Sequence, residues 1–176
     1  LIKIAIKGLH FDKETFRHSL RIGLPTGIQQ TLVAMGALAL LNIVNKFGTD
    51  VIAGYSVASR LDMLALIPAM SFSQALSTFV GQNIGANKPE RIKAGLRATI
   101  KMSGIVTIAT TVFIVIWGHV VMKMFTDDPE VIRIGDQYLT IVSIFYIAFT
   151  MMFIYNGVTR GAGDTFFPML FSILSL

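Results

Sequence analysis

The chain has 176 residues, of which 53% are apolar and only 14% are charged, and its formal net charge is +5. Soluble domains carry about 25% charged residues, so this composition excludes an ordinary soluble fold and favours a helical membrane protein. The absence of cysteine excludes disulfides and thiolate metal sites, and the three histidines are not spaced to form a helix-borne metal pair.

The first segment, residues 1–21, is basic and mixed in polarity. It predicts a cytoplasmic amphipathic linker that leads into a transmembrane part over residues 22–176. The tripeptide Gly23-Leu24-Pro25 precedes the first apolar run. Because proline is tolerated in the first turn of a helix, where its missing N–H costs little, we expect the first helix over about 25–47.

Three more long helices and a truncated one follow in the predicted order. The apolar runs predict helices over about 51–83, 90–125 and 130–159, and turn residues separate them at 48–50 and 126–129. Asp164 is a candidate N-cap for a fifth helix over 165–176, which holds about half of the roughly 20 residues that span hydrocarbon. The fold class is therefore all-α, a partial polytopic bundle, and we expect a piece of a longer protein.

Positive charge alternates between successive connections. Residues 1–21 and 88–101 are rich in Lys and Arg, whereas the connections near 46–50 and 123–136 are poor in them or balanced by acidic residues. The positive-inside rule places the first two segments in the cytoplasm and the others outside. Because the basic residues lie between apolar runs, they indicate membrane topology rather than a nucleic-acid partner.

The second helix carries two ionisable residues, Arg60 and Asp62, at membrane depth. Such a group costs at least about 2.5–3.5 kcal/mol unless it faces protein or water. The two side chains, two positions apart, point to nearly opposite faces, so each needs a partner on another helix. Either Arg60 extends toward water and Asp62 is structural, or both line a substrate or ion pathway.

Other polar residues inside the spans have two interpretations. They either form contacts between helices or line a polar pocket. Small hydroxyl residues such as Ser73 and Ser77 are expected to pack helices together. The remaining candidates for the substrate or ion pathway are Gln29, Gln30, Asn42, Asn45, Gln74, Tyr146 and Asn156.

No catalytic motif is present in the sequence. It has no GxxxxGK[ST] phosphate loop, and the serines have no histidine and aspartate at a plausible shared depth. We therefore expect no enzyme activity and no cofactor. Any transport would have to be driven by an ion gradient.

Residues 68–94, PAMSFSQALSTFVGQNIGANKPERIKA, closely resemble the loop after the second helix of each half in the multidrug and toxic-compound extrusion (MATE) family. The entry Gly23-Leu24-Pro25, the intramembrane Arg60 and an exit motif at 160–165 match at the expected intervals. The motif residues are Gly81, Gln82, Asn83, Gly85, Ala86 and Arg91 in the first stretch, and Arg160, Gly161, Gly163 and Asp164 in the second.

This resemblance implies a multi-pass antiporter of a prokaryotic plasma membrane that exchanges sodium ions or protons for organic cationic or amphipathic compounds. The chain would hold helices seven to ten and the start of the eleventh, and it would need the missing first-half bundle of the same protein as its partner. A related flippase for lipid-linked precursors is the alternative.

The chain departs from the family pattern in its acidic residues. Some members have an acidic residue in the first helix of this half and another in the fourth helix. In this sequence the first helix has Gln29 and Gln30 instead, and the fourth has no carboxylate over 145–153. Asp62 together with Gln30 or Asn45 is therefore the candidate ion site. The motif loop itself is expected to cap helix two through a left-handed Gly or Asn and to meet anionic lipids through Arg91 and its basic neighbours.

Overall fold

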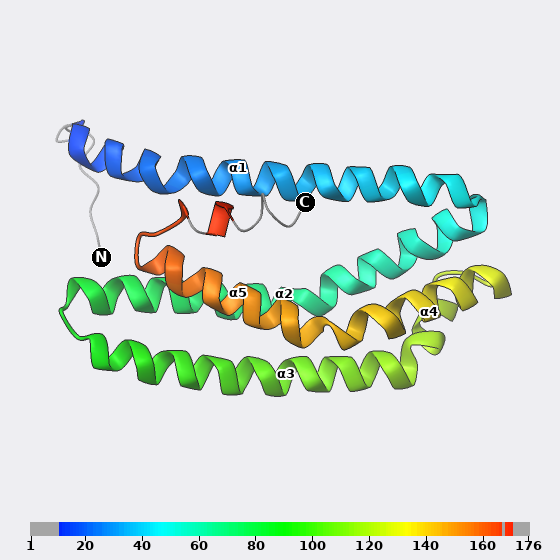
Figure 1. Cartoon of the computed structure of the whole chain (residues 1–176). Helices are drawn as coiled ribbons and strands as arrows, with labels where there is room; N and C mark the ends of the chain where they lie inside the picture. The colour runs from blue at the N-terminus through cyan, green and yellow to red at the C-terminus, as the bar shows by residue number, and fades with distance from the viewer. Residues whose placement is uncertain (1–10, 167, 171–176) are drawn as a thin grey trace.

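The computed structural model describes residues 11–166 and 168–170, and within them every regular element is a helix (Figure 1). Residues 1–10 of the predicted linker (1–21) and the end of the predicted fifth helix lie outside the described residues. The elements are α1 (Lys13–Val44), a short 3-10 helix η2 (Asn45–Phe47), α2 (Thr49–Gly85), α3 (Pro89–Lys123), α4 (Pro129–Ile144) and α5 (Tyr146–Gly161).

Helix α1 begins earlier than the sequence predicts, at Lys13 instead of about residue 25. Asp12 caps it, accepting from the Glu14 N–H at 2.9 Å and from the Thr15 hydroxyl at 2.6 Å. These hydrogen bonds, the one from Thr15 foremost, lower the pKa of the Asp12 carboxyl. The helix continues through Pro25. Membrane helices tolerate proline because neighbouring groups bond to the carbonyl that has lost its N–H partner.

Helices α2 to α5 form the packed bundle, and α1 lies along one side of it (Figure 1). Contacts pair Gly54 with Ile134 and Ser73 with Gly157, so α2 runs parallel to α4 and α5 in a nearly constant register. Helix α3 runs antiparallel to α2, α4 and α5 (Figure 1). By length and composition α1 with η2, α2 and α3 can each cross a membrane, and α4 with α5 can form a fourth, bent span.

The seam between α2 and α5 depends on two glycines one turn apart. A Cβ on Gly157 would lie 2.5 Å from the Ser73 carbonyl oxygen, and one on Gly161 would lie 2.4 Å from the Ser77 carbonyl oxygen. The Ser73 hydroxyl donates to the Phe153 carbonyl across the same seam. This is the close backbone approach that small residues permit in membranes, and the bond from Ser73 to α5 confirms the packing role predicted for that hydroxyl.

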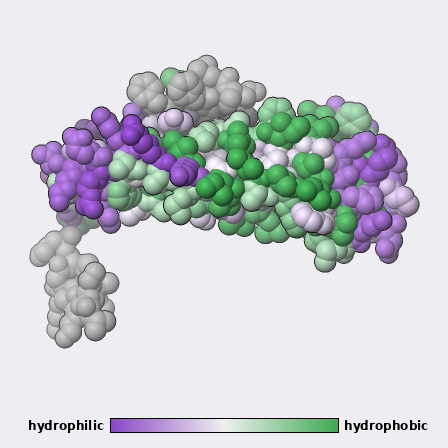
Figure 2. Space-filling view, turned by 90° about the horizontal axis from the view of Figure 1, so that it is seen from below, coloured by the Kyte–Doolittle hydropathy of each residue, from purple (hydrophilic) through white to green (hydrophobic). Residues whose placement is uncertain are grey.

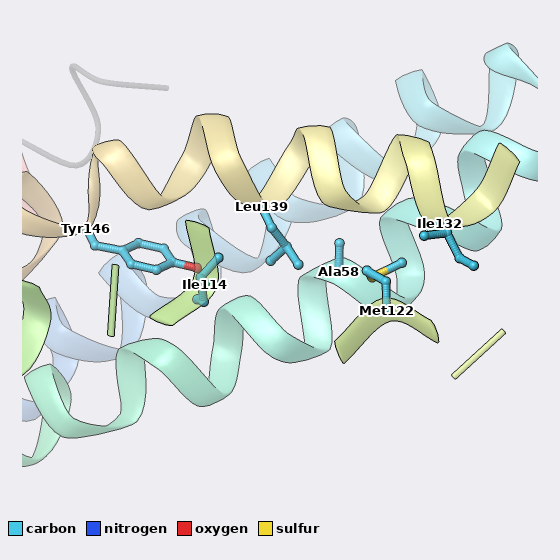
Figure 3. Close-up of a cluster of buried hydrophobic side chains, with 6 residues drawn as sticks. All are labelled: Ala58, Ile114, Met122, Ile132, Leu139 and Tyr146. Atoms are coloured by element: carbon cyan, nitrogen blue, oxygen red, sulfur yellow. The ribbon is translucent and has the colours of Figure 1, made fainter. Parts of the chain in front are cut away.

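Two apolar clusters fill the bundle at different depths. The first joins α2, α3, α4 and α5, and Figure 3 shows its six buried side chains: Ala58, Ile114, Met122, Ile132, Leu139 and Tyr146. The second lies toward the α2–α3 turn and consists of Leu76, Val80 and Ile154. Between them lies a buried contact of 2.8 Å that joins the Thr107 and Thr150 hydroxyls.

The predicted fourth helix, 130–159, is two helices in the structure, bent by 51° at Phe145. The Phe145 N–H bonds to the Val142 carbonyl at 2.9 Å, and the Thr111 hydroxyl of α3 donates to the Ser143 carbonyl at 3.2 Å. A hydroxyl from another helix thus takes part in the backbone pairing at the bend, where no proline is present.

The predicted turns are confirmed in their local chemistry. Asn87 adopts a left-handed φ of 53° after α2, and Pro89 begins α3. The Asp128 side chain accepts from the N–H groups of Glu130 and Val131 at the start of α4. Asp164 accepts from the Phe166 N–H at 3.2 Å, which is the geometry of an N-cap.

Charge and hydropathy divide the molecule along its length. Figure 2 shows an apolar band in the middle with hydrophilic surface at both ends. The start of α1, the α2–α3 turn and the end of α5 gather at one end, as the chain course in Figure 1 shows. The basic segments predicted to share the cytoplasmic side therefore lie together.

Candidate functional site

The amides predicted for the first helix lie mostly on its exposed surface. Gln30 and Asn42 on α1 and Asn45 in η2 are exposed. Gln29 is half-buried, and its side-chain amide donates to the Pro168 carbonyl at 3.4 Å. The described structure therefore does not gather these four residues into one pocket with the polar groups of α2.

Arg60 and Asp62 lie on different faces of α2, as their spacing predicts. Arg60 is exposed, whereas Asp62 is half-buried. The ion pair found within the described ranges joins Arg133 to Glu130 at 2.6 Å, and no pair of this kind joins Arg60 to Asp62 there. Asp62 therefore has no arginine in this part of the chain to balance its charge.

Asp62 faces α5, where Tyr146 is the first residue of the helix. The Tyr146 side chain is 1% exposed, and its ring lies inside the first apolar cluster (Figure 3). The carboxylate and the phenol are close enough to interact electrostatically. Within residues 11–166 and 168–170, however, neither Asp62 Oδ1 nor the Tyr146 hydroxyl completes a hydrogen bond of good geometry, although both atoms are buried.

Two further tyrosines extend this polar cluster. Tyr138 of α4 interacts electrostatically with Asp62, and its ring packs edge-on against Tyr55 of α2, with the ring centroids 5.4 Å apart. We call Tyr55, Asp62, Tyr138 and Tyr146 the Asp62 cluster. Sequence reasoning missed Tyr55 and Tyr138. The spacing of seven residues places Tyr55 on the helix face of Asp62, whereas Tyr138 and Tyr146 lie on either side of the bend at Phe145.

The groups that interact with Asp62 in the described part of the chain thus lie on α4 and α5. Gln30 and Asn45, its predicted partners in an ion site, are exposed on α1 and η2. Among the remaining pathway candidates, Gln74 is exposed on α2 and Asn156 is half-buried on α5, and both are sequence neighbours of the glycine–serine seam.

The two sequence motifs meet at the end of the bundle that carries the α2–α3 turn. Gly81 packs against the carbonyl oxygen of Gly161, which a Cβ on Gly81 would approach to 3.3 Å. Asn83 is buried, donates to the Phe79 carbonyl at 2.8 Å and accepts the Lys88 N–H on its own carbonyl at 2.9 Å. The other residues of the first motif, Gln82, Gly85, Ala86 and Arg91, are exposed.

The second motif turns toward the start of the chain. An open cavity of about 540 Å³ lies between α1 and the turn after α5, and Arg21, Pro25, Gly163 and Asp164 are among its lining residues. Gly163 has a φ of +81°, which favours glycine, and Arg160 is half-buried at the end of α5. The entry and exit motifs of the sequence are therefore neighbours in space.

The described residues contain no group of three or more His, Cys, Asp or Glu side chains that could hold a metal ion. Hard divalent cations take several oxygen ligands, often from more than one carboxylate. The Asp62 cluster has one carboxylate and three phenols, so it suits a singly charged partner better than a divalent one.

Comparison with known proteins agrees with this architecture. The sequence profile of the MatE family matches residues 25–176. The chain is 28% identical over 156 residues to the probable multidrug resistance protein YpnP of Bacillus subtilis (strain 168), covering 89% of the chain and 35% of the relative. It is 27% identical over 157 residues to the probable multidrug resistance protein NorM of Thermotoga maritima, covering 89% and 34%.

Solved structures show the same fold. A crystal structure of MATE in the straight conformation matches with a TM-score of 0.88 at 19% identity, covering 98% of this chain and 39% of the other. MATE in the bent conformation matches with a TM-score of 0.85 at 21% identity, covering 98% and 38%. The chain spans about a third of the length of the curated relatives it matches. With the helical bundle, the paired motifs and the family profile in agreement, the chain belongs to the MatE family of membrane transporters.

Proposed function

We propose that this chain is the part of a secondary active transporter that couples the export of organic cationic or amphipathic compounds to a gradient of sodium ions or protons. The family assignment and the relatives' names, multidrug resistance proteins, support export of varied small molecules. The membrane in question is the plasma membrane, and the other half of the transporter is the chain's partner.

The observation that carries the coupling is the uncompensated carboxylate of Asp62. It lies within a span of mean hydropathy 1.5 and has no arginine or lysine paired with it among the described residues. A charge in this position costs stability, and a purely structural span has no reason to retain such a residue. A cation that binds there and leaves again would give the carboxylate a use.

The lipid-precursor flippase considered as an alternative gains less support. A carrier of anionic lipid phosphates would need cationic side chains facing a central cavity. Arg60 is the one arginine or lysine in the sequence of α2, so this span offers a single cationic side chain. The multidrug-resistance relatives favour the first function.

The test uses the full-length protein that contains this chain, purified and reconstituted into proteoliposomes. Movement of a fluorescent organic cation such as ethidium is followed under an imposed sodium gradient, under a proton gradient and without a gradient. We expect transport against the ethidium gradient with one of the two ions, and its loss when an ionophore collapses that gradient. An ethidium flux that is the same with and without either gradient would overturn the proposal.

A further inference from the structure

Helix α3 has a row of basic side chains near its start. Lys93, Arg97 and Lys101 are spaced four residues apart, so they lie along one face of the helix, and all three are exposed. We call these three residues the α3 basic stripe. Within residues 11–166 and 168–170 none of the three forms an ion pair. Glu90, the acidic residue of α3, lies in the first turn of the helix and is not paired with the stripe there.

The stripe is held in place by the packing of the other side of α3. Ile92, Leu96 and Ile100 contact the second apolar cluster, and a Cβ on Gly95 would clash with the Phe79 ring of α2. This packing fixes the backbone and leaves the three charges on the outside. Like charges four residues apart on a helix repel one another. A fixed group of cations without acidic neighbours therefore suits an anionic partner from outside the bundle.

The same face of α3 continues as an apolar surface. Ile105, Ile108 and Val112 follow Lys101 at helical spacing, and their side chains are between 49% and 61% exposed. Figure 2 views the molecule from the side on which α3 lies, and it shows hydrophilic surface at one end next to the apolar band. A basic surface that adjoins an apolar one along a single line fits an amphipathic molecule with an anionic head.

The position of the stripe along α3 matches the headgroup layer of a bilayer. Lys101 and Lys123 are 22 positions apart with no Asp, Glu, Lys or Arg between them. That spacing is about 33 Å along the helix axis, close to the hydrocarbon thickness of about 30 Å. With Lys101 at the hydrocarbon boundary, Arg97 lies about 6 Å further out, within a headgroup layer of about 5–8 Å. Lys93 lies one turn beyond Arg97, at the outer edge of this layer.

We propose that the α3 basic stripe binds the headgroup of one anionic phospholipid in the leaflet at this end of the bundle. Arg97 and Lys101 bind the phosphate, to which the Arg97 guanidinium can donate two parallel hydrogen bonds. Lys93 adds positive charge beside them, and one acyl chain of the lipid lies along residues 105–112. Arg91 lies nearly opposite Lys93 around the helix, so it is not part of the site. The site does not depend on the transported compound or on the coupling ion.

The test uses the purified full-length protein in phosphatidylcholine nanodiscs that contain a trace of photoactivatable lipid. The probe carries a diazirine on an acyl chain and has either a phosphatidylglycerol or a phosphatidylcholine headgroup. Crosslinked peptides are identified and quantified by mass spectrometry. In the wild type we expect the phosphatidylglycerol probe to label residues 102–112 at least about tenfold more than the phosphatidylcholine probe, because each cationic side chain strengthens the binding of an anionic lipid. The variant Lys93→Gln/Arg97→Gln/Lys101→Gln should lose this preference.

The matched control is Lys13→Gln/Arg17→Gln/Arg21→Gln, which removes three exposed basic residues of the same spacing from α1, at the same end of the molecule. It should keep the phosphatidylglycerol preference at residues 102–112. An equal loss in both triple variants would show that the total charge of this end attracts the lipid, and it would overturn the site. Equal labelling by the two probes in the wild type, or no labelling of α3 by either probe, would also overturn it.

Each variant is first checked for a single symmetric gel-filtration peak. If the triple variant of α3 fails this check, Arg97→Gln is used with Arg17→Gln as its control, since each replaces one exposed arginine. We expect Arg97→Gln to lower the phosphatidylglycerol preference by about fivefold. A preference that is unchanged in Arg97→Gln would overturn the proposal.

Discussion

Helix α1 and the bundle of α2–α5 are built from similar proportions of apolar residues but are held in the molecule differently. No residue of α1 is buried, and large side chains such as Leu24, Met35 and Leu38 are exposed along it. In α2, by contrast, six residues are buried, and several of its contacts run through glycine and serine. Lipid is as apolar as leucine, so apolar surface alone does not bring membrane helices together, whereas close approach and hydrogen bonds do.

The difference indicates which surfaces of the chain already have packing partners. In the bundle, small residues and hydroxyls make contacts with neighbouring helices, for example through the Thr107–Thr150 pair. Helix α1 presents apolar side chains and the amides of Gln30 and Asn42 outward. We interpret α1 as the helix that meets lipid or the other half of the transporter, and the following changes test that interpretation.

The largest effect is expected from a side chain placed in the α2–α5 seam. Gly157→Leu would bring its Cβ to 2.5 Å from the backbone oxygen of Ser73, where no flexible atom can give way. We expect a loss of about 3 kcal/mol or more of unfolding free energy, measured by thermal unfolding of the purified protein in detergent. Gly27→Leu in α1 is the matched control, because a Cβ there meets nothing within 4 Å of the described atoms. Equal losses in both variants would remove the contrast between the two regions.

A change at Asp62 is expected to act in the opposite direction on stability. Asp62→Leu removes a half-buried, unbalanced carboxylate from an apolar surrounding, and we expect the unfolding free energy to rise by about 1–2 kcal/mol. The same variant should lose gradient-driven export, so the unfolding temperature rises while the transport rate falls. A less stable Asp62→Leu protein would show that the carboxylate is a structural partner.

A smaller effect is expected from the hydroxyl pair between α3 and α5. Thr107→Val leaves the buried Thr150 hydroxyl without the 2.8 Å contact and should cost about 1 kcal/mol. The double variant Thr107→Val/Thr150→Val should recover part of this loss, since neither partner is then left unpaired. A strictly additive double variant would mean that the two hydroxyls do not depend on each other.

The smallest effect on the fold is expected in α1. Asn42→Leu replaces an exposed amide and should change the unfolding free energy by less than about 0.5 kcal/mol. If Asn42 faces a substrate pathway, ethidium export changes while stability does not. A large loss of stability would show that the Asn42 amide makes a structural contact with the remainder of the protein.

The helices were predictable because each depends on information within one segment. The length of the apolar runs, the Asp128 cap, Pro89 at a first turn and the left-handed Asn87 are local features, and the structure has all of them. The early start of α1 is local too, but Pro25 offered a competing start, and the Asp12 cap decides between them.

The bend and the partner of Asp62 depend on contacts between segments far apart in the sequence. The break at Phe145 involves the Thr111 hydroxyl of a different helix, and no proline or glycine marks it. The approach of Asp62 to Tyr146 follows from the parallel register of α2 with α4 and α5, which the close approach at Gly54 and Gly157 fixes. Spacing along one helix identifies a polar face but not the helix that lies opposite.

The parallel seam connects the middle of the bundle directly to the end that holds the two sequence motifs. Asp62 and Gly81 lie 19 positions apart on α2, about 28 Å along the helix axis. Over that distance α2 stays in contact with α5, and the glycines leave little slack between the two backbones. A displacement at the Asp62 cluster would therefore be passed along the α2–α5 seam to the turns after α2 and α5, and Pro68 of α2 is the point in between where the helix can bend.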